Sequence, residues 1–275
     1  MAMTNSQRHH HVLKLHLYIL TAMAAMLTAC GHRAASADAQ QDTLQTDTVT
    51  YLLGDSTHHI VMKADWPVAD GDSLAVAVRS YIDHEREELQ QFFRDNASEY
   101  AVFEGESQIR KIHETTGYVT YLNTSDFFQG GLHGSHLVIG TTFRKSDGSQ
   151  IGYTSTFDEE ALTFKITGQR LFKDTTAPAF CQLLKEGVRS YFSEGMDTIC
   201  TDADLKDMTL GVEDIDRLPI PQFAPYFTPD GLLFIYQQYE IAPYAVGLPS
   251  FTIAYDKLCP FLTDEAAALL PKQQQ

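Results

Sequence analysis

The sequence predicts an α+β fold in which mainly antiparallel sheet or sheets pack with two principal helices. Two segments, 73–96 and 178–192, carry apolar residues at helical spacing. Short runs rich in β-branched and aromatic residues, separated by turn signals, lie before, between and after these helices. An order of strands, helix, strands, helix, strands is typical of α+β proteins, and the hairpins favour antiparallel pairing.

The first elements are a hairpin and a long helix. Residues 49–53 and 60–64 are apolar runs on either side of the turn signal 54–56. Asp70-Gly71-Asp72-Ser73 then offers an N-cap for the helix 73–96. Its buried face is expected to be Leu74, Val78, Tyr81, Ile82, Leu89, Phe92 and Phe93.

The middle of the chain is rich in strand signals. We expect strands at 107–113, 117–128, 137–145 and 161–167. The second helix, 178–192, has Pro178 in its first turn, where a missing N–H costs nothing, and Thr175 or Thr176 as its cap. Its buried face is expected to be Leu183, Leu184, Val188, Tyr191 and Phe192.

The C-terminal part combines a short helix with a further hairpin. The acidic stretch 201–217 predicts a short helix and a loop. Segments 223–228 and 232–239 flank Pro229-Asp230-Gly231, a tight-turn signal, and predict a hairpin. A strand at 250–255 and a short helix at 256–262 follow, and residues 264–275 are expected to be a polar tail.

The N-terminus has the layout of a secretory signal. Arg8 and Lys14 precede an apolar run that ends in Leu27-Thr28-Ala29-Cys30 and is too short to span a bilayer stably. This ending resembles the lipobox of bacterial lipoproteins, which implies acylation of Cys30 and a lipid-anchored location in the cell envelope, periplasmic or surface-facing. The alternative is an ordinary cleaved signal with a chance cysteine.

The predicted domains follow from this layout. Residues 1–29 form the signal peptide, 30–47 a small, polar and flexible tether, and 48–263 the folded body. Residues 1–29 hold two of the 20 Lys and Arg and none of the 36 Asp and Glu, so the remaining chain has a net charge near −18. This charge argues against nucleic acid as a partner and is compatible with a basic protein, or with solubility alone.

The cysteine count supports no redox or zinc role. Cys181, Cys200 and Cys259 remain after lipidation, and no C-x-x-C is present. An oxidising envelope permits a disulfide, and Cys181–Cys200 would bracket one helix, but the odd number leaves the pairing open.

Gly130-Gly131-Leu132-His133-Gly134-Ser135-His136 is the one glycine-dense loop. It lacks the Lys-Ser/Thr of a P-loop, the third glycine of a dinucleotide turn and the context of a G-x-S-x-G nucleophile. His133 and His136 would face opposite sides of a strand, so only a loop could bring them to one metal. We expect no metal, no cofactor and no catalytic residue here, and a structural loop is the simpler interpretation.

The segment from Tyr236 to Gly247 is more distinctive. If residues 236–239 are a strand, Tyr236 and Gln238 share one face and Gln237 and Tyr239 the other. Glu240 and Tyr244 then lie in a loop bounded by Pro and Gly. This aromatic and acidic loop suits a protein-contact surface, and equally a loop capped by tyrosine hydroxyls at a sheet edge.

These segments together resemble a known family. The resemblance depends on segments that follow one another in a fixed order along the chain. They are the Gly-Gly-x-His loop, Phe157-Asp158, Thr167-Gly168, Leu171-Phe172-Lys173-Asp174, Phe227 to Leu232, Tyr239 to Gly247 and Phe251 to Tyr255. The pattern, over about residues 48–263, resembles the extracytoplasmic C-terminal domain of the anti-sigma factor RsiV, a domain of unknown function (the 3298 family). The resemblance implies binding of a protein such as lysozyme, which is basic, and supplies no catalytic residues. No cytoplasmic sigma-binding segment or deacetylase module accompanies it, so we expect neither role.

Two functions of different classes remain open. The first is a non-enzymatic, lipid-anchored envelope protein that binds either a protein, such as a basic, lysozyme-like one, or a cell-wall ligand. The second is an envelope hydrolase of glycan or peptide that uses His133 or His136 and a carboxylate. We predict that His133, Glu240 and Tyr244 contribute to one partly exposed patch. The alternative is that Glu240 satisfies backbone donors inside the fold, and a pocket where both histidines meet carboxylates would favour the hydrolase.

Overall fold

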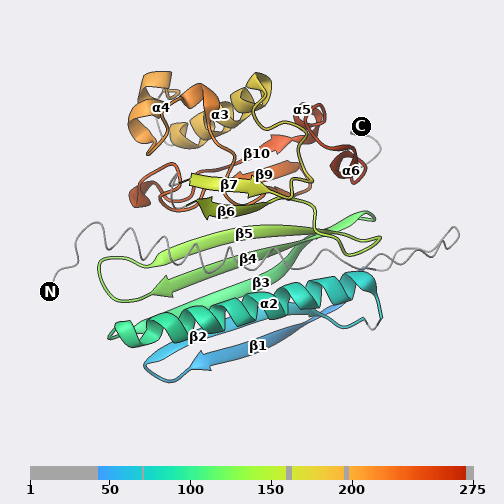
Figure 1. Ribbon diagram of the computed structural model, residues 1–275, viewed down its shortest axis with the longest axis vertical. Helices are drawn as coiled ribbons and strands as arrows, with labels where there is room; N and C mark the ends of the chain where they lie inside the picture. The colour runs from blue at the N-terminus through green and yellow to red at the C-terminus, as the bar shows by residue number, and fades with distance from the viewer. Residues whose placement is uncertain (1–42, 70, 159–162, 195–197, 271–275) are drawn as a thin grey trace, which may run out of the picture.

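The computed structural model describes residues 43–69, 71–158, 163–194 and 198–270 and confirms the predicted α+β class (Figure 1). The strands are β1 (Thr46–Gly54), β2 (His58–Pro67), β3 (Phe103–Glu114), β4 (Tyr118–Phe128), β5 (Ser135–Arg144), β6 (Thr154–Asp158), β7 (Thr163–Thr167), β8 (Tyr226–Phe227), β9 (Gly231–Ile235) and β10 (Ser250–Ala254). The helices are α2 (Ser73–Asn96), α3 (Pro178–Ser193), α4 (Asp202–Met208), α5 (Tyr255–Leu258) and α6 (Asp264–Ala267). Short 3-10 turns are η1 (Ala97–Glu99), η2 (Ile215–Arg217) and η3 (Tyr244–Val246).

The N-terminal half is a five-stranded sheet in the order β1-β2-β3-β4-β5. Hairpin neighbours are antiparallel, whereas β2 and β3 are parallel because α2 connects them across the sheet. Figure 1 shows α2 lying along this sheet. The sheet therefore has one face covered by its own crossover helix.

Helix α2 has the bounds that its sequence predicts. The Asp72 carboxylate accepts the backbone N–H of Leu74 at 3.1 Å and so caps the first turn. The predicted apolar face is buried except for Phe93, which is half-buried. Phe92 packs against Phe103 of β3 and Phe127 of β4, with ring centroids 5.5 and 5.2 Å apart. These contacts fix the helix over the middle of the sheet.

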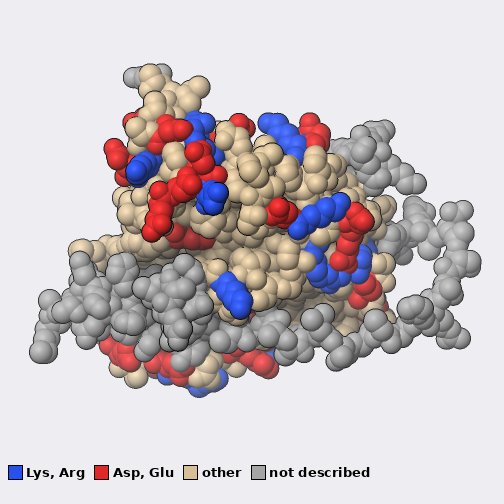
Figure 2. Space-filling model, turned by 45° about the horizontal axis from the view of Figure 1, so that its top comes forward, with Lys and Arg blue, Asp and Glu red and all other residues tan. Residues whose placement is uncertain are grey.

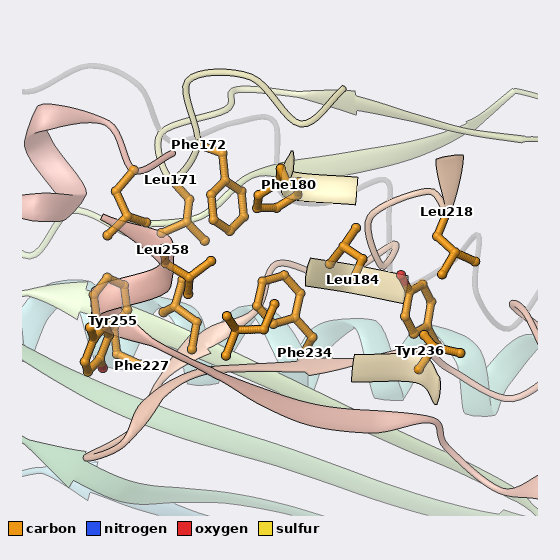
Figure 3. Packing of buried hydrophobic residues seen from close by; sticks show 14 of the residues in the cluster. Leu171, Phe172, Phe180, Leu184, Leu218, Phe227, Phe234, Tyr236, Tyr255 and Leu258 are labelled. Carbon is orange, nitrogen blue, oxygen red and sulfur yellow. The ribbon is translucent and has the colours of Figure 1, made fainter. Parts of the chain in front are cut away.

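The C-terminal half has a separate core. A three-stranded sheet, β10-β9-β8, and the hairpin β6–β7 lie beside the large sheet, with α3 packed on β10. Figure 3 shows the buried side chains between these elements, among them Phe172, Phe180, Leu184 and Phe234. Lys185 of α3 is buried, and its ammonium group contacts the carboxylates of Asp202 and Asp216, which are exposed. Acidic and basic side chains accordingly gather around α4 and α3 (Figure 2).

The two halves share strand β4. Val119 and Tyr121 face α2, whereas Tyr118 and Thr120 face the C-terminal core. Tyr118 packs on Phe227 with centroids 4.9 Å apart, and the Thr120 hydroxyl donates to the Phe227 carbonyl at 3.1 Å. The large sheet is thus buried on both faces along this strand.

Glycine is required where β8 crosses β5. A Cβ atom on Gly140 would lie 1.9 Å from Cδ1 of Tyr226, which is far inside van der Waals contact. The tyrosine ring occupies the space that any larger residue at 140 would need. Close approach of the two halves therefore depends on this glycine.

Several sequence-based expectations about the elements are wrong. Leu183 and Tyr191, expected on the buried face of α3, are half-buried. The N-cap of α3 is Ala177, without a side-chain hydrogen bond, because the Thr176 hydroxyl instead bonds Asp174. Strand β9 ends at Ile235, so residues 236–239 are not a strand. Strand β6 was not expected at all.

Both predicted boundaries of the folded body also need correction. Leu44, placed in the tether, is buried, and its N–H donates to the Glu114 carboxylate at 2.8 Å. Residues 264–270, placed in the polar tail, include α6, and Leu269 and Leu270 are buried in the C-terminal core. The signal segment 1–29, Cys30 and residues 31–42 lie outside the described residues.

Cys181 and Cys200, the pair that would bracket α3, are free thiols. The Cys181 sulfur lies 3.7 Å from the Thr175 carbonyl, and the Cys200 sulfur lies 3.8 Å from that of Met208. Among the described helices, none has the length and apolar character needed to cross a membrane.

Candidate functional site

The two loops that the sequence singles out meet at one end of the large sheet. The first follows β4 and enters β5, and the second joins β9 to β10. Gly130 and Gly131 both have positive φ, 77° and 106°, with no atom within 4 Å of an added Cβ. Their role is therefore conformational, since a left-handed backbone disfavours other residues. They turn the chain so that His133 reaches the second loop.

His133 and Tyr244 are stacked. Their ring centroids are 3.8 Å apart with an interplanar angle of 21°. The hydroxyl of Tyr239 lies 3.5 Å from Nε2 of His133, and the Tyr239 and Tyr244 centroids are 6.2 Å apart. We call His133, Tyr239 and Tyr244 the aromatic patch. Leu132 beside it is 94% exposed. The predicted proximity of His133 and Tyr244 is confirmed.

Tyr239 holds a strained backbone. Its φ of 65° makes it the one non-glycine residue with positive φ in the described part of the chain. Such a conformation costs about 1–3 kcal/mol in a non-glycine residue and is concentrated at functional sites. The side chain is 36% exposed. Tyr239 lies in a turn in which the Glu240 N–H donates to the Gln237 carbonyl at 3.0 Å. This turn places the Tyr239 hydroxyl next to His133.

Glu240 does not belong to the patch. Its carboxylate accepts the backbone N–H of Gln222 at 2.6 Å and that of Gln237 at 2.7 Å. Burial raises the pKa of this carboxyl group from its ordinary value to about 8, although both backbone donors act to lower it. The predicted shared patch is therefore wrong for Glu240, which satisfies backbone donors inside the fold.

The two glutamines of the same motif have a structural role as well. Gln237 donates to the Val138 carbonyl at 2.8 Å and accepts the Val138 N–H at 3.2 Å. Gln238 accepts the N–H of His136 at 3.1 Å. Strand β5 is the outer strand of its sheet, so these side chains bind backbone groups that would otherwise be unpaired. They attach the second loop to β5 and thereby position Tyr244.

An open hollow of about 420 Å³ adjoins the patch, and Tyr244 forms part of its wall. Cross-strand register places Glu106, Asp126 and His136 in one row across β3, β4 and β5. His59 and Glu104 form a neighbouring pair on β2 and β3 and also line the hollow. We call this the acidic hollow. Lys63 binds Glu106 at 3.0 Å, which leaves Glu104 and Asp126 to give it a negative charge.

Of the residues that line the hollow, His136 and Asp126 most resemble a catalytic pair. Nδ1 of His136 lies 2.6 Å from Oδ1 of Asp126, and both side chains are partly exposed. His133 stacks on the Tyr244 ring but is not among the residues that line the hollow. Among the described residues, no hydroxyl or thiol is hydrogen-bonded to His136, and no three His, Cys, Asp or Glu residues form a group suited to a metal ion. The pair can exchange a proton, but no nucleophile is positioned by it.

Sequence reasoning missed Tyr239, Asp126 and Glu106. Tyr239 was placed on a strand, so its side chain was not assigned to the patch. The two carboxylates lie 20 residues apart and meet only through the register of β3 and β4. Since a register slip of one residue would reverse the face of either side chain, no local signal could have found this row.

Comparison with known proteins gives a family for part of the chain. Residues 169–256 match the model of a family described as protein of unknown function (DUF3298). This confirms the resemblance to that domain of unknown function over the matched residues. No curated protein matches the chain.

Two solved structures share the fold. A DUF3298 family protein from Pseudomonas aeruginosa PAO1 aligns with a TM-score of 0.57 at 16% identity, over 84% of this chain and 98% of that one. A DUF3298 member from Bacteroides fragilis NCTC 9343 aligns with a TM-score of 0.54 at 14% identity, over 80% and 94%. At these identities the likeness establishes the α+β fold alone.

Proposed function

We propose that this chain is a lipid-anchored cell-envelope protein, not an enzyme, that binds a basic protein such as a lysozyme through the aromatic patch and the acidic hollow. The observation that carries the proposal is the stacked and strained cluster of His133, Tyr239 and Tyr244 at the surface. Aromatic side chains held in fixed positions are the usual anchors of protein interfaces.

The charge beside the patch supports a basic partner. Glu104 and Asp126 line the hollow that Tyr244 borders, and the whole chain has a net charge of −16. Complementary charge increases the association rate and excludes acidic partners, with a strong dependence on ionic strength. An anionic cell-wall polymer would be repelled by the same surface, so a basic protein is the better candidate for the ligand.

The binding proposal is tested by removing the patch without removing its scaffold. Hen lysozyme is the probe, and its affinity is measured by biolayer interferometry at low and physiological salt. Replacing His133 and Tyr244 together by Ala removes two partly exposed rings, so affinity should fall at least about tenfold with little change in melting temperature. Equal affinity of wild type and this variant at both salt concentrations would refute the role of the patch.

The contribution of charge is tested separately. Asp126→Asn removes one charge from the acidic hollow, and Asp230→Asn removes one from the exposed turn before β9 as a matched control. Lysozyme should associate more slowly with the first variant than with the second. Identical association rates would show that the hollow does not guide the partner.

The lipid anchor is proposed from Leu27-Thr28-Ala29-Cys30. Cells fed radiolabelled palmitate should label the wild-type chain and not Cys30→Ala, and the variant should leave the membrane fraction or remain unprocessed. Equal labelling of both proteins would contradict the assignment of Cys30.

A hydrolase of glycan or peptide is the second candidate, and the 2.6 Å pair of His136 and Asp126 is the observation in its favour. Release of soluble fragments from purified peptidoglycan, lost in His136→Ala, would support it over the binding function. Binding of lysozyme by a chain that releases no fragments would exclude it for this substrate.

A further inference from the structure

A groove between α3 and β10 has the construction of a peptide-binding site. Its volume is about 400 Å³, within the range typical of ligand sites. One wall is the whole of β10, Ser250–Ala254. The other is a stripe along one side of α3, formed by Leu183, Glu186, Gly187, Ser190, Tyr191 and Glu194. It is distinct from the aromatic patch and the acidic hollow, with which it shares no lining residue.

Strand β10 presents unpaired backbone groups to this groove. It is the outer strand of its sheet and pairs only with β9 among the described strands. The Tyr236 N–H donates to the Pro249 carbonyl at 2.9 Å, and the register Ser250↔Ile235 continues from that bond. Along an antiparallel strand, residues that hydrogen-bond to the neighbouring strand alternate with residues that do not. Ser250 and Thr252 belong to the second kind, so their N–H and C=O groups point away from β9. Within the described chain these groups have no hydrogen-bond partner, and Thr252 is exposed.

The helix lies close enough to the strand to form the second wall. A Cβ on Gly187 would be 2.1 Å from the Phe251 ring, so α3 contacts β10 directly at this point. The Tyr191 hydroxyl donates to the Val246 carbonyl at 2.8 Å and closes one end. Lys257, just past β10, lines the other end. The five residues of β10 span about 17 Å, enough for an added strand of similar length.

The charge of the helix wall selects the occupant. Glu186 and Glu194 line the groove together with one cation, Lys257, so the lining has a net negative charge. We propose that an extended peptide segment of a partner protein, carrying Lys or Arg side chains, binds here by adding a strand to β10. Main-chain hydrogen bonds to Ser250 and Thr252 supply affinity, and the two glutamates select basic side chains. A second copy of this chain fits less well, because edge-to-edge pairing would bring the glutamates of both copies together.

The test uses the full chain and a fluorescein-labelled decapeptide of alternating Lys and Val, with binding followed by fluorescence anisotropy. A Glu-Val peptide tests the charge. Two Lys-Val peptides, N-methylated at either the odd or the even positions, test the main-chain bonds. The Lys-Val peptide should bind at least about tenfold more tightly than the Glu-Val peptide, and methylation of one set of alternate positions should remove binding. Failure of the Lys-Val peptide to bind, or equal binding of all four peptides, would overturn the proposal.

Two variants locate the binding. Thr252→Pro removes the outward N–H, a change that an edge strand tolerates, and should weaken binding of the Lys-Val peptide at least about tenfold. Glu186→Lys combined with Glu194→Lys keeps the strand intact and should have an effect of similar size, even if the proline variant unfolds. Glu213→Lys, at an exposed loop position outside the groove, is the matched charge control and should leave affinity unchanged.

Further outcomes separate this groove from the other surfaces. The double variant of His133 and Tyr244 should bind the Lys-Val peptide normally, so loss of lysozyme binding and loss of peptide binding are independent results. Sedimentation velocity tests the second copy: a dimer that dissociates in Thr252→Pro would overturn the peptide assignment. If Glu213→Lys lost as much peptide affinity as the groove variant, the loss would reflect the net charge of the chain and not the groove. This result would also overturn the peptide assignment.

Discussion

Glu240→Gln separates a structural role of this residue from a binding role. In the folded chain the carboxyl group is enclosed and bound by the backbone N–H groups of Gln222 and Gln237. Burial raises its pKa from an ordinary value near 4.5 to about 8. Between these two pH values the folded state holds a proton that the unfolded state has lost. The stabilisation of the folded state that this raised pKa contributes is therefore complete below about pH 4.5 and is lost as the pH rises through 8.

The size of the effect follows from the difference between the two pKa values. One pKa unit corresponds to about 1.4 kcal/mol, so a difference of about 3.5 units gives ~5 kcal/mol across the range. The free energy of unfolding of the wild type should fall by as much as ~1.4 kcal/mol per pH unit through this group. Burial also raises the pKa of Glu85, a residue of α2, to about 7, which adds a dependence of the same sign. Comparison with the variant isolates the part due to Glu240.

The measurement is urea unfolding of wild type, Glu240→Gln and the exposed control Glu213→Gln at half-unit steps from about pH 5 to 9. The variant has no titrating group at position 240, so its curve should be flatter than that of the wild type, whereas the control curve should run parallel to it. Parallel curves for wild type and Glu240→Gln would refute the reasoning. Unchanged stability together with weaker lysozyme binding would instead assign Glu240 to the binding surface.

Three further predictions concern the fold and are checked by thermal and urea unfolding. Leu89→Ala, on the buried face of α2, should cost about 2–5 kcal/mol, and an unchanged melt would show that the site is not packed as described. Gly140→Ala should cost at least about 1–3 kcal/mol because Tyr226 must move, and a neutral result would contradict the close approach of β8 and β5. Deleting residues 264–275 removes the buried Leu269 and Leu270 from the C-terminal core, together with the Glu265 contacts of Arg170 and Arg144. The deletion should therefore destabilise the chain by several kcal/mol. A stable truncated chain would restore the prediction of a polar tail.

The fold was predictable where the local pattern carries the whole signal. Helix α2 combines a cap at Asp72 with apolar residues at helical spacing, and both of its bounds are correct. The pattern fails for α6, because the segment is polar at its start and its two leucines gain their burial only from the distant core. It fails also for Tyr236 to Tyr239, where the aromatic alternation of a strand continues into a turn held by Glu240. In both cases the tertiary contact overrides the local preference.

The candidate site was predictable only as two separate loops. Glycine at 130 and 131 marked a turn with special backbone geometry, and the positive φ values confirm that expectation. The stack of His133 on Tyr244 was foreseen as proximity, but not as ring contact. The assignment of Glu240 shows why residue type is insufficient, since an acidic side chain in a loop serves equally for a ligand and for two backbone donors. Only the direction of the carboxylate distinguishes them.

The folding unit is larger than the matched family segment. Residues 169–256 supply α3, the three-stranded sheet and most of the C-terminal core. However, the same core also contains buried residues from outside this segment. Those before it are Tyr118, Ile151 and Tyr153, and those after it are Leu258 and Leu262. Strand β4 then ties that core to the one under α2, because its alternate residues belong to different clusters. The two solved structures of similar fold align over 84% and 80% of the chain, which agrees with one unit that extends across both halves. The aromatic patch and the acidic hollow lie where these halves meet, so their geometry requires both cores to be folded.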